Sequence, residues 1–279
     1  MSDRIEVRKT YKLFIGGAFP RPESGRTFPV NGPDGTVAQV AKASRKDVRD
    51  AVRAARAAQQ SWADRTPYNR GQIIYRIAEV LEGRSAQFVA EQVTLGLDAL
   101  GAQSDVERAV DCAVYWAGFA DKLDQLVGST NGVAGPFLNL STPEPLGVCA
   151  LACPDDGGVR GIVGLLAPAI MAGNAVVAVA GELASLVMST LGEVVATSDV
   201  PGGVVNLLTG RHDDLLPWLA DHDDVDLVDT TGASDALRTD IESRAAANVK
   251  HVVRTNGTED LGTASAFCQI KTVWHPARI

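Results

Sequence analysis

The stretch Pro168-Ala169-Ile170-Met171-Ala172-Gly173-Asn174-Ala175-Val176-Val177 decides the fold of this chain. It ends a segment of helical length over 162–171, turns at Gly173 and opens an apolar run over 175–179. Because that run is nearly continuous rather than alternating, it is typical of a strand buried on both faces of a sheet. We therefore predict a helix that leads directly into an interior strand.

The same pattern extends along the chain in both directions. The apolar runs are Val148 to Cys153, Ala175 to Val179, Val204 to Leu208, Val225 to Val228 and Val249 to Val253. The segments of helical length between them lie around Ile162 to Met171, Leu183 to Thr197, Asp213 to Ala220 and Ser234 to Ala247. Such alternation predicts an α/β fold, with a doubly wound, Rossmann-like and mostly parallel sheet. Ligands of these sheets bind at the carboxyl ends of the strands, so candidate site residues are sought there.

The part before this sheet has a different composition. Residues 45–126 are rich in Ala, Arg and Glu, with apolar residues at helical spacing, which predicts a helical N-terminal part. Residues 129–143 carry Gly, Pro and Ser, with an apolar alternation around Phe137 and Leu140. This pattern indicates an extended connection or edge strands.

Composition argues against several classes of function. The 279-residue chain has 46% hydrophobic and 22% charged residues, which is typical of a globular protein. Its formal charge of −8 opposes nucleic acid as a partner, because that binding depends on Lys and Arg. Residues 1–10 are charged and no later segment forms an apolar span of bilayer length. We therefore expect a cytoplasmic protein with no membrane partner.

The Cys and His residues predict neither a disulfide framework nor a metal site. Four cysteines are present without C-x-x-C spacing, namely Cys112, Cys149, Cys153 and Cys268. Cys149 and Cys153 are four residues apart, so we expect both on one buried face of a strand. Two His-Asp-Asp runs begin at His212 and His222, but adjacent residues in polar loops do not converge on one ion.

Three blocks keep a spacing that resembles the aldehyde dehydrogenase superfamily: Glu144 to Val148, Pro168 to Val177 and Pro201 to Asn206. Leu13 to Gly17, Asp47 to Trp62 and Tyr68 to Arg70 resemble the entry region of the same family, and Phe267 to Pro276 is similar to its C-terminus. The resemblance implies a nucleotide-binding domain formed by residues 11–128 and 144–257. It also implies oligomerisation strands within 129–143 and 265–279. The family's catalytic domain, which carries a nucleophilic Cys, is not matched, and only Thr258 to Ala264 occupies its place.

The resemblance also implies that the catalytic groups are missing. Asp156 stands where the family has the Asn that donates to the oxyanion, and an ionised Asp only accepts hydrogen bonds. Thr255 stands where the family has the general-base Glu, and Thr takes up no proton at neutral pH. With the Cys absent as well, no catalytic residue is assigned. The alternative to a role in catalysis or cofactor binding is that Asp155 and Asp156 cap the following helix.

Some of the residues that bind the cofactor in the family have counterparts in this sequence. Glu182 matches the ribose-binding Glu, whereas Val179 replaces the neighbouring Lys. Thr231, Gly232 and Ser234 match part of the family's phosphate turn. The other interpretation is structural: Glu182 is a helix-dipole partner, Gly232 closes an ordinary turn and Ser234 caps the next helix.

These residues lead to two expectations of function. The first is a non-catalytic subunit without a cofactor, similar to the degenerate second half of tandem aldehyde dehydrogenases, that assembles with a full-length dehydrogenase or with itself. Its expected interface residues are Phe137, Leu140, Phe267, Ile270, Val273 and Trp274. The second is an NAD(P)-dependent aldehyde oxidoreductase that takes its catalytic residues from a partner. A sensor for another nucleotide is a third possibility, and nothing in the sequence selects its ligand.

Overall fold

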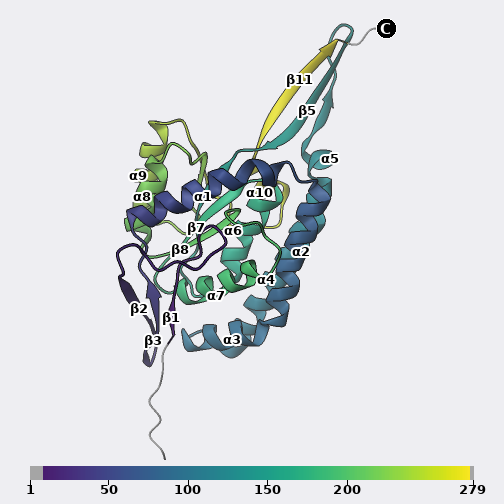
Figure 1. Cartoon of the computed structure of the whole chain (residues 1–279). Helices are drawn as coiled ribbons and strands as arrows, with labels where there is room; N and C mark the ends of the chain where they lie inside the picture. The colour runs from purple at the N-terminus through teal and green to yellow at the C-terminus, as the bar shows by residue number, and fades with distance from the viewer. Residues whose placement is uncertain (1–8, 277–279) are drawn as a thin grey trace, which may run out of the picture.

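A five-stranded parallel sheet forms the centre of the computed structural model, which describes residues 9–276 (Figure 1). Its strands lie in the order β10-β9-β6-β7-β8. Their bounds are β6 Val148–Ala152, β7 Ala175–Ala180, β8 Val205–Thr209, β9 Leu227–Asp229 and β10 His251–Val253. The chain moves from β6 outward to β8 and then crosses to β9 and β10, so the predicted doubly wound sheet is confirmed.

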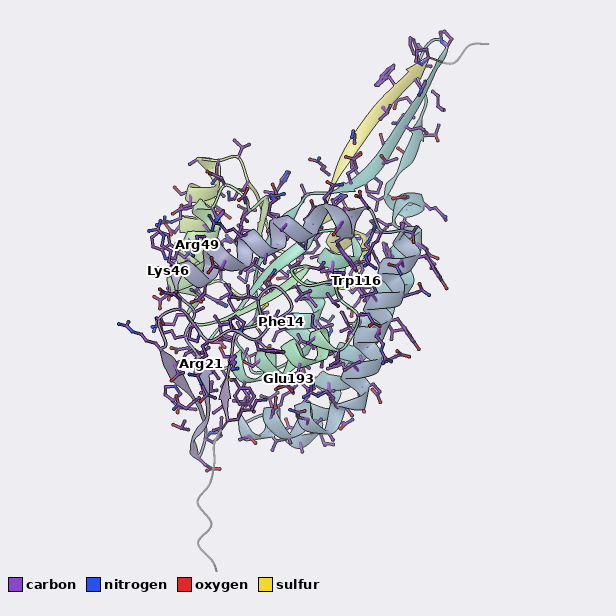
Figure 2. The ribbon with its side chains drawn as sticks, in the orientation of Figure 1. Phe14, Arg21, Lys46, Arg49, Trp116 and Glu193 are labelled. Carbon is purple, nitrogen blue, oxygen red and sulfur yellow. The ribbon has the colours of Figure 1, made fainter. Side chains whose placement is uncertain are left out.

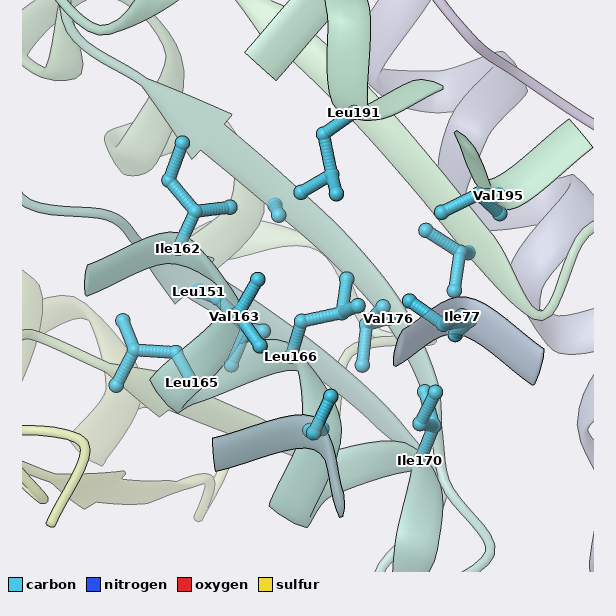
Figure 3. Close-up of a cluster of buried hydrophobic side chains, with 14 of the residues drawn as sticks. Ile77, Leu151, Ile162, Val163, Leu165, Leu166, Ile170, Val176, Leu191 and Val195 are labelled. Atoms are coloured by element: carbon cyan, nitrogen blue, oxygen red, sulfur yellow. The ribbon is translucent and has the colours of Figure 1, made fainter. Parts of the chain in front are cut away.

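Helices cover both faces of this sheet. Helix α6 (Arg160–Met171) and α7 (Ser185–Ala196) lie on one face, and α1 (Arg45–Ala63), α8 (His212–Asp221) and α9 (Asp235–Ala246) lie on the other. Alternate strand residues enter the two cores, because successive side chains of a strand point to opposite faces. Leu151 and Val176 pack with Ile162 and Leu166 of α6 on the first face (Figure 3).

The N-terminal part contributes four more helices and a second sheet. Helices α2 (Pro67–Gly83), α3 (Ser85–Thr94) and α4 (Ala99–Phe119) add an outer layer over α6 and α7, followed by η1 (Ala120–Lys122) and α5 (Leu123–Val127). Trp116 of α4 is fully buried there, whereas Lys46 and Arg49 of α1 lie at the surface on another side of the molecule (Figure 2). A small sheet of order β1-β3-β2 precedes them, formed by Thr10–Tyr11, Gly35–Ala41 and Thr27–Gly32. This sheet was not predicted from the sequence.

A three-stranded antiparallel arm projects from the body (Figure 1). It consists of β4 (Ser129–Asn131), β5 (Phe137–Pro145) and β11 (Cys268–Pro276), with β5 in the middle. Every residue of β11 pairs with one of β5, from Cys268 opposite Pro145 to Pro276 opposite Phe137. A short helix that was not predicted, α10 (Leu261–Ala266), leads into β11. The arm thus joins two segments that are far apart in the sequence.

The buried amide of Asn174 connects this arm to the parallel sheet. Its Oδ1 accepts a hydrogen bond from the Gly147 N–H (2.8 Å), between β5 and β6. Its Nδ2 donates to the carbonyl oxygens of Ala169 in α6 (3.0 Å) and of Phe267, the residue before β11 (2.9 Å). Because Asn174 is fully buried, water cannot replace these partners.

We expect Asn174→Ala to lower the free energy of unfolding by about 2–4 kcal/mol, because it leaves buried backbone groups without partners. Urea unfolding followed by circular dichroism measures this loss. Asn31→Ala is the matched control, since Asn31 is exposed on β2, and it should change the stability by less than about 0.5 kcal/mol. Equal stability losses in the two variants would contradict the assigned role of Asn174.

Candidate functional site

The carboxyl ends of β6 and β9 meet where the strand order reverses, which is the usual ligand position in this kind of sheet. Here the loop after β9 rests directly on the end of β6. The Gly232 N–H donates to the Ala152 carbonyl oxygen at 2.8 Å. A Cβ atom on Gly232 would lie only 2.2 Å from the carbonyl oxygen of Cys153. The backbone of the chain itself therefore occupies the space at this point.

A buried carboxylate organises the neighbouring loops. Asp229, at the end of β9, is fully buried, and its Oδ1 accepts the Thr231 N–H at 2.8 Å. Its Oδ2 accepts the Thr255 hydroxyl at 2.6 Å, and the Thr231 hydroxyl in turn accepts the Asn256 N–H at 3.0 Å. Two of the donors predicted for a phosphate, the N–H groups of Thr231 and Gly232, are thus already bonded within the chain.

The first turn of α6 is capped by a side chain from α4. Asp105 Oδ2 accepts the N–H groups of Val159 (2.7 Å) and Arg160 (3.2 Å). The same Oδ2 also accepts a hydrogen bond from Nε2 of the buried Gln92 at 2.8 Å. A carboxylate is stabilised there because the N-terminal end of a helix is its positive end. An anion of the protein therefore fills the position where a ligand phosphate would bind.

The prediction that Asp155 and Asp156 cap α6 is therefore wrong. Asp156 Oδ1 accepts the Gly158 N–H (2.9 Å) within the loop that precedes α6. Asp155 Oδ1 instead accepts the Ala184 N–H (2.8 Å) at the start of α7. The N-cap position of α6 is Val159, which has no polar side chain, so the carboxylate has to come from another element.

Glu182 and Ser234 lie on different loops of the same edge. Glu182 is exposed in the loop after β7, next to Gly181, where an added Cβ atom would lie 2.2 Å from the carboxyl carbon of Asp155. Ser234 caps α9, since its hydroxyl accepts the Leu237 N–H at 3.3 Å. The structure thus separates the predicted cofactor residues by role: Ser234, Thr231 and Gly232 have partners within the chain, and Glu182 faces solvent.

The connection between β10 and α10 is a folded segment held by α6. Arg160 Nη2 donates to the Gly257 carbonyl oxygen at 3.0 Å and pairs with Glu259 Oε1 at 2.8 Å. Gly257 has a φ of +64°, and a Cβ atom there would lie about 3.3 Å from the Gly164 backbone. A glycine is required because the turn both adopts a left-handed conformation and contacts α6 closely. No local pattern in the sequence indicates the roles of Arg160, Asp105 and Asp229.

None of the four thiols has the properties of a catalytic nucleophile. Burial raises the pKa of the Cys112 and Cys268 thiols to about 12, and it also raises the pKa of Cys149 and Cys153. Cys149 and Cys153 belong to the same core, as expected from their spacing. Nucleophilic attack by cysteine requires the thiolate, so none of these groups is activated in the folded chain.

The arm presents most of the residues predicted for an interface. Phe137 and Trp274 form an edge-to-face pair near its tip, with ring centroids 5.9 Å apart. Leu140, Ile270 and Val273 are also exposed. The prediction that Phe267 lies in the interface is wrong. Phe267 is fully buried in the chain's own core, because it is the C-cap residue of α10 and the strand begins one residue later.

Comparison with known proteins matches this architecture to one family. The sequence profile of the aldehyde dehydrogenase family matches residues 21–264. The chain is 31% identical to cytosolic aldehyde dehydrogenase 1 of Elephantulus edwardii over 92% of its own length, and 33% identical to an aldehyde dehydrogenase of Aspergillus niger over 89%. The solved NAD-dependent aldehyde dehydrogenase of Sinorhizobium meliloti superposes with a TM-score of 0.80 at 26% identity, over 88% of this chain.

The chain belongs to the aldehyde dehydrogenase family. It spans about half the length of these relatives: 52% and 50% of the two curated sequences, and 50% of the solved chain. Within residues 9–276, no helix has the length and apolar character needed to cross a membrane. Over the same range, no cluster of three or more His, Cys, Asp or Glu side chains is placed to hold a metal.

We expect the thiols of the folded protein to react with iodoacetamide far more slowly than those of the unfolded chain. A pKa of about 12 instead of 9 lowers the thiolate fraction at neutral pH about a thousandfold, as for Cys112. Mass spectrometry of the labelled chain in buffer and in urea measures the difference. The rate in buffer should still be rising with pH at pH 9, where the rate of the unfolded chain begins to level off, because the thiol pKa of the folded chain is higher. One rapidly labelled cysteine at neutral pH would reveal an activated nucleophile and contradict the expectation.

Proposed function

We propose that this chain is a non-catalytic aldehyde dehydrogenase-like subunit that acts as a structural or regulatory partner, either of a full-length aldehyde dehydrogenase or of a second copy. The observation that carries the proposal is the hydrogen bonding at the carboxyl ends of the parallel strands. Where the family resemblance places catalytic groups, the side chains of this chain are used to hold its own loops together.

Three chemical points support a non-catalytic role. The Asp156 carboxylate accepts the Gly158 N–H and lacks the N–H donors with which an Asn side chain would stabilise an oxyanion. The Thr255 hydroxyl donates to Asp229 and cannot serve as a general base. Burial raises the pKa of all four thiols, so none of them is a ready nucleophile at neutral pH.

The residues at the strand ends also do not fit a dinucleotide well. A pyrophosphate needs free N–H donors, and those of Thr231 and Gly232 have partners. Asp155 and Asp105 place carboxylates at the N-termini of α7 and α6, where they repel phosphate. We therefore propose that the chain has no nucleotide cofactor.

The arm supports a role in assembly. It projects from the body with exposed apolar side chains on both faces, and a three-stranded sheet of this kind is stabilised by further packing. We propose that 129–143 and 265–279 act as the oligomerisation strands beside a nucleotide-binding-type domain, although residues 277–279 lie outside the described range. A cytoplasmic location is proposed because the chain is similar to a cytosolic relative. Residues 1–8, on which the expectation from the sequence partly depends, also lie outside the described range.

One observation favours the alternative, an NAD(P)-dependent oxidoreductase completed by a partner. Glu182 is exposed at the end of β7, where its carboxylate is free to accept the hydroxyls of a ribose. This single contact leaves the phosphates without donors, so the alternative requires rearrangement of the loops after β6 and β9.

Calorimetric titration of the purified chain with NAD+ or NADP+ should show no saturable heat, and mixtures with aldehydes should not reduce either cofactor. The solved Sinorhizobium meliloti relative serves as the positive control. Saturable binding that disappears in a Glu182→Gln variant would contradict the proposal and support the alternative.

Trp274→Asp should convert the assembled protein into monomers, because it places a charge in the apolar surface near the arm tip. Analytical ultracentrifugation measures the mass. Val93→Asp is the matched control, since Val93 is also exposed but lies on α3, at the opposite end of the molecule from the arm (Figure 1). An assembled mass that Trp274→Asp leaves unchanged would show that the arm is not the interface.

A further inference from the structure

A groove between α1 and α8 has no part in the site described above. Its volume is about 830 Å³, which is within the usual range of small-molecule pockets. Its charged and aromatic lining consists of Arg45, Lys46 and Arg49 on α1, Trp218 on α8, and residues 221–224, where α8 ends. The two helices contact each other, and Figure 2 shows Lys46 and Arg49 at the end of α1 that lies beside α8 in Figure 1.

One wall of the groove is cationic. Arg45 and Arg49 are four residues apart, so they lie on the same face of α1, where like charges at this spacing disfavour the helix. The Arg45 guanidinium lies over the Trp218 ring, 4.2 Å from its centroid. This stacking holds the Arg45 side chain in place without neutralising its charge.

The opposite wall is acidic. It carries the exposed carboxylates of Asp221, Asp223 and Asp224. Burial lowers the pKa of His222, so the ring that stands between them adds no charge at neutral pH. This wall is therefore negative at neutral pH.

The loop that carries the acidic wall is fixed by its own hydrogen bonds. Arg56 Nη2 donates to the Asp224 carbonyl oxygen at 2.8 Å and to Asp226 Oδ2 at 2.5 Å. Asp226 Oδ2 also accepts the Val148 N–H at 2.7 Å, at the start of β6. The Asp224 N–H in turn donates to His222 Nδ1 at 3.2 Å. Because these bonds tie the loop to α1 and to the central sheet, a ligand would not have to order it.

The two walls do not neutralise each other. Lys46 pairs with Glu23 and Arg49 with Asp50, and neither of these carboxylates lines the groove. Within residues 9–276, no ion pair crosses the groove, and Arg45 has no carboxylate partner at all.

The acidic wall likewise keeps one carboxylate free. Asp221 pairs with Arg244, and Asp224 lies 4.0 Å from Arg56. In the described part of the chain, Asp223 forms no ion pair. A molecule with charges of both signs can therefore pair with both walls, whereas a molecule with a single charge is repelled by one of them.

We propose that the groove between α1 and α8 binds a small zwitterion, such as an amino acid, with a carboxylate at one end and an ammonium group at the other. The carboxylate pairs with Arg45 and the ammonium group with Asp223. The carbon chain between them lies along Trp218, whose ring is 39% exposed. This inference goes beyond the proposed function and does not depend on it, because it involves neither the arm nor the strand ends.

Nuclear magnetic resonance of isotope-labelled indole groups tests the proposal, because Trp218 reports from inside the groove. A Trp218→Phe variant assigns its signal among those of the four Trp residues. Titration with 6-aminohexanoate in low-salt buffer should move the Trp218 signal to saturation, whereas the fully buried Trp62 and Trp116 should keep their signals. Hexanoate and hexylammonium each carry one of the two charges, so each should bind about threefold or more weakly. Equal affinity for either of them, or no saturation with 6-aminohexanoate, would overturn the proposal.

Two variants test the assigned partners. Arg45→Gln and Asp223→Asn should each weaken the binding of 6-aminohexanoate about threefold or more. In Asp223→Asn, 6-aminohexanoate should also lose its advantage over hexanoate, because the ammonium group has lost its partner. Arg108→Gln is the matched control, since Arg108 is exposed on α4, on the other face of the sheet, and should leave the affinity unchanged. Both groove variants replace exposed side chains, and unchanged Trp62 and Trp116 signals show that they are folded. Wild-type affinity in either groove variant would contradict the proposed site.

Discussion

The side chain of Asn174 joins the parallel sheet to the antiparallel arm through three buried hydrogen bonds. One bond fixes the start of β6, another fixes the end of α6, and the third fixes the first residue before β11. A buried amide cannot exchange these partners for water, so the bonds specify one relative position of the segments. The arm is thereby held at a defined place on the body, although it contributes little to the central core.

The central sheet could be predicted because the sequence pattern of each strand is contained within a few consecutive residues. Each strand from β6 to β8 is entirely buried and mostly apolar, and each is followed by a segment of helical length. The sheet of β1, β2 and β3 could not be predicted in this way. Strand β1 has only two residues, β2 and β3 are partly polar and exposed, and the three depend on pairing between distant positions, such as Thr10 with Gln39.

The candidate site was less predictable for a related reason. The residues at the strand ends could be found from the pattern, but the groups that bind them could not. Asp105 reaches Val159 across 54 residues, and no local signal in α4 marks it as a helix cap. Phe267 was misassigned because an apolar residue next to a strand can point into the body as easily as onto the arm; its burial depends on α10, which was not predicted.

Native mass spectrometry of the chain, purified from its source at its endogenous level, tests most directly whether it works as a non-catalytic subunit. A complex that contains a second copy or a larger aldehyde dehydrogenase, with no dinucleotide bound to this chain, is the predicted result. A monomer that carries NAD(P) would contradict it, because both the assembly and the closed strand ends would then have been interpreted wrongly.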